Sequence, residues 1–244
     1  MRASPMNQSF ITDVPTILTE DSTLRLAYAD HPKLLLRLSE FVDAHSLQNK
    51  PALIIQAAPT DDDIEADVLD PASLKVLRDN GGEENSWWRG FQSFNRPRPT
   101  FRGVQATDHG SEPAWACEYH RDGHVIAGLW TFDEQHTAKG AVSCLSDYFA
   151  PIFADFARTA LGLAAARGGA TAAQLTATLL HASDLHFAKI PEYGNVPQMI
   201  LPTRTQHLCW RVRKVDDSNS WRIAVERMGA ELLGIGGARP IAPT

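Results

Sequence analysis

One short stretch constrains the fold of this chain more than any other. The run WACEYHRDGHVIAGLW, residues 115–130, has Asp122 and Gly123 between two apolar, strand-like segments. Aspartate followed by glycine between such segments is the strongest short signal for a β-hairpin, because both residues accept the backbone angles of a tight turn. A two-residue turn would pair Trp115 with Trp130. We therefore predict a hairpin in a central sheet, with the two tryptophans as cross-strand neighbours on one face.

Periodic apolar patterns predict further elements on both sides of the hairpin. Residues 23–29 and 51–58 are typical of strands, and they flank an amphipathic helix over 30–45, an order that fits a βαβ unit. The remaining expected elements are helices over 70–80, 146–167 and 220–235 and strands over 173–182 and 207–215. The fold class expected is α+β: a mixed sheet with an N-terminal strand-helix-strand unit, a central β-hairpin and flanking helices.

The organisation along the chain follows from changes in composition. Residues 1–95 form an N-terminal α/β segment that contains an acidic span over 61–84. Residues 96–103 are rich in proline and arginine and are expected to form a linker or loop. Residues 104–244 then form an α+β unit. The alternative is one continuous domain, since 244 residues with 43% hydrophobic composition can build a single large core.

The composition also limits the class of protein. A net charge of −6 argues against binding nucleic acid over the whole surface. The cysteines Cys117, Cys144 and Cys209 are scattered and form no CxxC pair, which excludes a zinc ribbon and favours a reduced, cytoplasmic, soluble protein. The chain has no run of 18 apolar residues and no apolar segment near its N-terminus, so neither a membrane span nor a secretory signal is expected.

A second stretch, LLHASDLHFAK over residues 179–189, carries a resemblance to a known family. It resembles the first motif of the calcineurin-like metallophosphoesterases, in which a β-strand ends in Asp-x-His. The resemblance implies that Asp184 and His186 bind one metal of a two-metal pair. Residues i and i+2 at a strand end point the same way, so this spacing suits shared coordination. A metal pair of this kind polarises a phosphate and generates hydroxide at neutral pH.

The other ligands of that family should follow downstream. The only later aspartates are Asp216 and Asp217, which do not follow glycine, and the only later histidine is His207. The alternative is therefore an ordinary strand that leads into a turn. We expect no cofactor, with a divalent metal as the alternative. His120 and His124 have the spacing of a helical zinc pair, but the predicted hairpin turn should place them on different faces.

The strongest candidate for binding is SWWRGFQSFNRPRPTFR, residues 86–102, which holds four arginines, five aromatic residues and no acid. Aromatic rings stack on bases and arginines pair with phosphates, so this mixture suits single-stranded nucleic acid. A second group of basic residues, Arg211, Arg213 and Lys214, could extend such a binding surface. The candidate binding residues are Trp87, Trp88, Arg89, Arg96, Arg98, Arg102, Arg211 and Arg213.

Two alternatives for this stretch follow from its surroundings. Either the arginines are exposed and contact a polyanion, or the acidic span over 61–84 folds onto them while the aromatic residues join the core. No G-x-S-x-G, P-loop or G-x-G-x-x-G motif occurs in the chain. We therefore predict a non-catalytic binding or accessory protein with a nucleic-acid or protein partner and no membrane contact. The alternative is a metal-dependent phosphoesterase.

Overall fold

The computed structural model describes most of the chain from Asp21 to Ile235. The described ranges are 21–61, 63–78, 90–91, 96–108, 113–131, 142–145, 149–169, 171–189, 198–200 and 206–235, of which 142–145, 186–189, 198–200 and 233–235 are described as backbone.

The centre of the molecule is an antiparallel sheet in the order β10-β7-β1-β5-β4-β3-β2, with β11 also paired to β7. A small second sheet has the order β6-β8-β9, with β6 and β8 parallel. The large sheet consists of β1 (Ala52–Pro59), β2 (Arg98–Pro99), β3 (Gly103–Thr107), β4 (Trp115–His120), β5 (Val125–Leu129), β7 (Ala173–Leu180), β10 (Leu208–Cys209) and β11 (Arg213–Val215). The small sheet consists of β6 (Val142–Leu145), β8 (Leu185–Lys189) and β9 (Gln198–Ile200).

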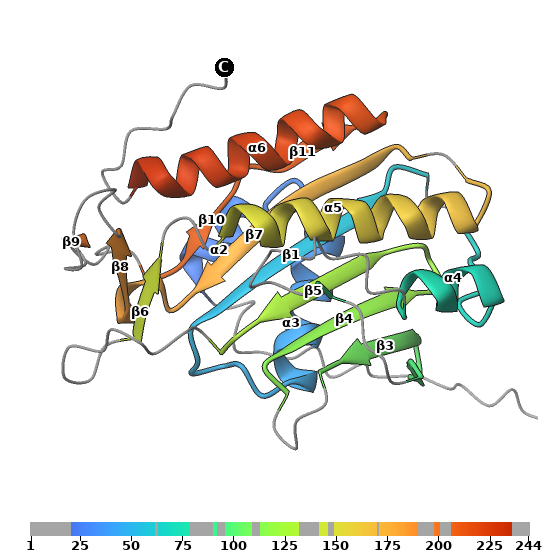
Figure 1. Ribbon diagram of the computed structural model, residues 1–244, viewed down its shortest axis with the longest axis horizontal. Helices are drawn as coiled ribbons and strands as arrows, with labels where there is room; N and C mark the ends of the chain where they lie inside the picture. The colour runs from blue at the N-terminus through green and yellow to red at the C-terminus, as the bar shows by residue number, and fades with distance from the viewer. Residues whose placement is uncertain are drawn as a thin grey trace, which may run out of the picture.

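Helices cover both faces of the large sheet, which makes the protein an α+β fold of three layers (Figure 1). The helices α5 (Phe149–Ala166) and α6 (Ser218–Ile235) lie on one face, where α4 (Pro71–Val76) also packs against α5. The helices α2 (Ser22–Ala27) and α3 (Pro32–Ala44) lie on the other face. The expected linker at 96–103 does not divide the large sheet. Strand β1, which precedes the linker in the chain, lies between β5 and β7, which follow it.

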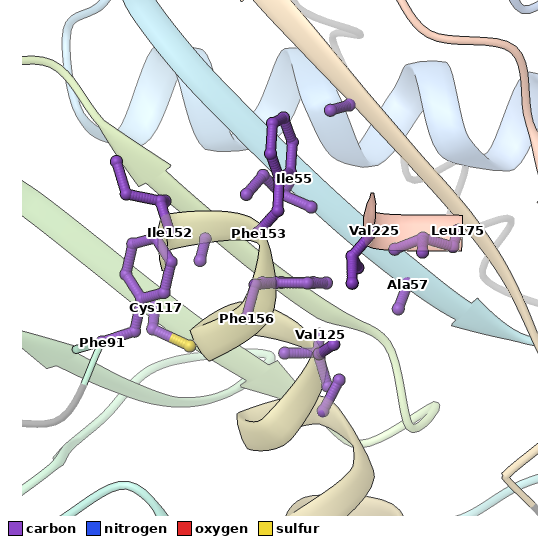
Figure 2. Packing of buried hydrophobic residues seen from close by; sticks show 14 of the residues in the cluster. Ile55, Ala57, Phe91, Cys117, Val125, Ile152, Phe153, Phe156, Leu175 and Val225 are labelled. Carbon is purple, nitrogen blue, oxygen red and sulfur yellow. The ribbon is translucent and has the colours of Figure 1, made fainter. Parts of the chain in front are cut away.

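The larger part of the core lies between the sheet and α5 with α6. Figure 2 shows Phe153 and Phe156 of α5 among Ile55, Cys117 and other buried side chains of the strands. In the described part of the chain, α5 is the one helix long and apolar enough to cross a membrane. It contacts α4, α6 and β1 and directs its buried residues into this cluster, which is the packing of a core helix.

The expected strand over 23–29 is wrong, because this segment is the helix α2. The carboxylate of Asp21 accepts hydrogen bonds from the amides of Thr23 and Leu24 and so caps the helix. The helix places Leu24 and Tyr28, four residues apart, in the core, and leaves Leu26 79% exposed. The N-terminal strand-helix-strand unit is therefore helix-helix-strand, and β1 has antiparallel neighbours on both sides.

The other helix predictions are confirmed. Asp70 caps α4 through the amides of Ala72 and Ser73, and Gly168 follows α5 with φ of +68°. The face of α6 that packs into the core holds Trp221, Ala224, Val225, Met228 and Leu232, which are all buried. The single strand expected over 207–215 is instead divided into β10 and β11, both paired with β7.

The hairpin prediction is confirmed, but its register is wrong by one residue. Trp115 lies opposite Leu129 rather than Trp130. The turn has three residues and ends at Gly123, whose φ of +75° is the left-handed conformation that completes a three-residue hairpin loop. Because a shift of one residue exchanges the two faces of a strand, Trp115 joins the cluster under α5 while Trp130 packs on the α3 side.

Candidate functional site

The register of the hairpin brings together polar side chains that were expected to lie apart. His120 and His124 face each other across the strands, with the amide of His120 donating to the carbonyl of His124 at 2.9 Å. Their rings lie on the same face, with centroids 5.9 Å apart, so the expected placement on different faces is wrong. Glu118, two residues before His120 on β4, joins them on the side that α3 covers.

Glu118 bridges two histidines. Its Oε2 lies 2.8 Å from His120 Nε2 and its Oε1 lies 2.9 Å from His45 Nε2, at the C-terminal end of α3. Burial by itself would raise the pKa of Glu118, but the hydrogen bonds from His120 and His45 outweigh it and lower the pKa to about 2. The ring of His45 is held between Phe41 and Trp130, with centroid distances of 4.4 and 5.2 Å. The carboxylate is therefore ionised and fixed in position at neutral pH.

A pocket of about 310 Å³ opens onto this carboxylate. Its wall comes from the end of α3, the loop between β2 and β3, and the strands β3 and β4. The lining residues are Glu40, Ala44, His45, Thr100, Phe101, Arg102, Gln105 and Glu118. Arg102 forms an ion pair with Glu40, and Phe101 at the rim is 97% exposed. The pocket therefore has a polar floor, a cation in its wall and an aromatic ring at its entrance.

An ion-pair network ties α3 to the hairpin turn beside this pocket. Arg37 donates to Glu40 at 3.0 Å and to Asp122 at 2.7 Å, and Lys33 lies 3.7 Å from the same aspartate. Burial by itself would raise the pKa of Asp122, but the contacts with Arg37 and, to a smaller extent, His124 outweigh it and lower the pKa to about 2. This network therefore links the hairpin turn to the part of α3 that supplies Glu40 to the pocket.

A second polar cluster lies near the opposite edge of the sheet. His207 Nε2 is 3.6 Å from Asp21, and the His207 and His181 rings have centroids 5.2 Å apart. The neighbouring Cys209 resembles a nucleophile at first sight, but burial raises the pKa of its thiol to about 11. Since the thiolate is the nucleophilic form, Cys209 is not activated at neutral pH.

The structure places Asp184 and His186 at the start of a strand rather than at its end. Strand β7 ends at Leu180, Asp184 closes a 3₁₀ turn over Ala182–Asp184, and His186 belongs to β8. Asp184 is exposed and accepts a hydrogen bond from Ser183. The side chain of His186 lies outside the described residues. Within the described part of the chain, no three His, Cys, Asp or Glu side chains are grouped so as to hold a metal. The metal site remains a prediction.

The arginine and aromatic stretch divides between surface and core. Trp87, Trp88 and Arg89 lie outside the described residues. Phe91 is fully buried, and its amide donates to Asp155 at 2.7 Å, so this aromatic residue joins the core as the alternative expected.

The described arginines of the stretch are Arg96, Arg98 and Arg102, and they lie near the edge of the large sheet that β2 forms. Arg96 and Arg98 are exposed, and Arg102 forms an ion pair with Glu40 of α3. The structure does not bring Arg211 and Arg213 to this surface. They lie by β11 at the opposite edge, six strand spacings or roughly 29 Å away, and Arg213 pairs with Glu231 of α6.

In comparisons with known proteins, no family model, no curated protein and no solved structure matches this chain. The geometry of the site therefore carries the case for a function. Sequence reasoning missed the floor of the pocket, because His45, Gln105 and Glu118 come from three separate elements and form no local motif. The nearest signal was the hairpin itself, whose correct register would have placed Glu118, His120 and His124 on one face.

Proposed function

We propose that the protein is a binding protein that contacts a single-stranded nucleic acid, or a polyanion like it, at the β2 end of the sheet. The observation that carries the proposal is the exposed ring of Phe101, which lies between Arg98 and Arg102 in sequence and at the mouth of a polar pocket. A ring that is 97% exposed contributes little to the core. It is available to stack on a base, and stacking next to arginine is the usual mode of single-strand binding.

The distribution of charge supports a small, local contact. Arg102 is already paired with Glu40. Arg98 is exposed on the edge strand β2, and Arg96 is exposed two residues before it. The net charge of −6 means that the protein as a whole does not attract a polyanion. Binding should therefore neutralise few phosphates, and the logarithm of the affinity should fall only by about 0.7 per phosphate for each tenfold rise in salt.

The test is a titration of a fluorescent single-stranded oligonucleotide at two salt concentrations. The double variant Arg96→Gln, Arg98→Gln is compared with the control Arg211→Gln, Arg222→Gln, in which two exposed arginines are removed away from the β2 end. Both variants change the net charge equally, so a difference between them reports position rather than total charge.

We expect wild type and the control to bind alike. The Arg96 and Arg98 variant should bind more weakly, with a salt slope lower by about 1.4. Phe101→Ala should weaken binding by roughly 5- to 150-fold, the usual contribution of one stacked base, while Leu26→Ala, which removes another exposed side chain, should not. If wild type fails to bind at low salt, or if both double variants lose affinity equally, the proposal is wrong.

A further inference from the structure

The floor of the pocket offers two hydrogen-bond acceptors held side by side. An ionised carboxylate has about four lone-pair sites on its two oxygens. In Glu118 one site on each oxygen is occupied, by His45 and by His120. The side chain is 13% exposed and lines the pocket, and these two hydrogen bonds leave one lone-pair site on each oxygen. The two histidines also prevent the carboxylate from rotating, which fixes the direction of both acceptors.

Two adjacent acceptors select a ligand with two adjacent donors. Among the four nucleobases, guanine alone presents two neighbouring N–H groups on its Watson–Crick edge, at N1 and N2. Adenine and cytosine place an amino group beside a ring nitrogen acceptor, and uracil places one N–H between two carbonyls. Proteins recognise unpaired nucleotides in this way, by hydrogen bonds to the Watson–Crick and Hoogsteen edges of their bases.

The other groups of the pocket fit the same ligand. Arg102 in the wall pairs with Glu40 through Nη1 and has further N–H groups that can donate to O6 and N7 of guanine, the acceptors that arginine reads most often. Phe101 at the rim can stack on the ring. A guanidinium ligand would also match the carboxylate, but the exposed Arg98, which lies opposite the lining residue Gln105, and the exposed Arg96 two residues before it favour an anion. The volume of about 310 Å³ lies at the lower end of the range for small-ligand pockets.

We infer that this pocket binds one guanine base of a single-stranded nucleic acid, with its N1 and N2 donors on Glu118, its ring against Phe101 and its phosphates toward Arg96 and Arg98. The inference rests on the proposed function, since it names the base that the same site takes. It assigns Glu118 as the residue that determines specificity.

The experiment uses oligouridine strands that differ in one central base: guanine, inosine, adenine or uracil. Inosine keeps N1–H and O6 of guanine and lacks only the N2 amino group, so it tests the second acceptor in the unaltered protein. We expect guanine to bind roughly 10- to 100-fold more tightly than adenine or uracil, with inosine between them.

Glu118→Gln replaces one acceptor by a donor and should abolish the preference for guanine. The control Glu231→Gln removes an exposed carboxylate near the opposite edge of the sheet and should leave the preference intact. If Glu118→Gln does not fold, the inosine series in wild type still decides the question.

The outcomes separate the two proposals. Binding that is equal for all four strands and is weakened by Arg96→Gln, Arg98→Gln overturns the guanine pocket and leaves the proposed function standing. Guanine and inosine binding equally would remove the role of the second acceptor and overturn the assignment to Glu118. Methylguanidine displacing the guanine strand as well as guanosine monophosphate does would identify a pocket for cations and overturn the inference. Failure of wild type to bind any strand at low salt overturns both proposals.

Discussion

His124 makes the stability of this protein depend on pH in a way that one substitution should remove. Its ring is fully buried, and in the described part of the chain neither ring nitrogen has a hydrogen-bond partner. Burial and, to a smaller extent, the neighbouring His120 lower the pKa of His124 from 6.5 to about 3. Arg37 and Lys33 act in the same direction, and Asp122 opposes them.

The sign and size follow from proton linkage. Since the pKa of His124 is lower in the folded state, the unfolded chain binds more protons between pH 3 and 6.5. The contribution of His124 to stability is therefore complete above pH 6.5 and is lost as the pH falls toward 3. At about pH 4.5 the loss amounts to about 3 kcal/mol, because each pH unit below the unfolded pKa costs about 1.4 kcal/mol.

The substitution His124→Leu keeps a similar volume and removes the titrating group. We expect the free energy of unfolding of wild type to fall by about 3 kcal/mol more than that of the variant between pH 7 and about pH 4.5. At pH 7 the variant should be as stable as wild type or more so, because it removes two unpartnered buried nitrogens.

The measurement is urea unfolding followed by tryptophan fluorescence at a series of pH values. The control is Ile126→Val, a small core truncation in the adjoining strand β5 that should lower stability by about 1 kcal/mol at every pH. Parallel pH profiles for wild type and His124→Leu would show that His124 is not the group that titrates, and would refute the argument from burial.

Three further predictions concern other parts of the fold. Phe156→Ala should lower the free energy of unfolding by about 3–5 kcal/mol in urea unfolding, because the ring is fully buried in the cluster under α5; a loss below 1 kcal/mol, as expected for the exposed Phe101→Ala, would contradict this packing. Gly123→Ala should cost about 2 kcal/mol or more in the same assay, since φ is +75° and an added Cβ would collide with neighbouring side chains; unchanged stability would argue against the three-residue turn. If the metallophosphoesterase resemblance is functional, elemental analysis of the purified protein should find stoichiometric Mn, Fe or Zn that is lost in Asp184→Ala, His186→Ala; metal-free wild type after purification in metal-supplemented buffer would dismiss it.

The elements that the sequence predicted well are those whose signals are local. The helix α4 begins at a capping aspartate followed by proline, and α5 is followed by glycine in the left-handed conformation. The inward face of α6 follows from its 3.6-residue period alone. Asp122 and Gly123 identify a hairpin because the angles they accept are rare elsewhere in a chain. In each of these cases a few neighbouring residues carry all the information.

Tertiary packing decided what these local signals leave open. In residues 23–29 the alternation of Leu24, Leu26 and Tyr28 suits a strand, which would place all three side chains on one face, whereas the helix buries Leu24 and Tyr28 and leaves Leu26 exposed. A two- and a three-residue turn are both compatible with Asp122 and Gly123, so the burial of Trp115 under α5 and of Trp130 toward α3 chooses the register.

That choice of register then creates the pocket. It turns Glu118, His120 and His124 to the same face, where α3 brings His45 to them from more than seventy residues away in the chain. A contact between residues so distant in sequence leaves no periodicity and no spacing by which to recognise it. The sequence therefore determined most of the helices and strands, whereas the pocket exists only because long-range burial aligned elements that carry no local record of one another.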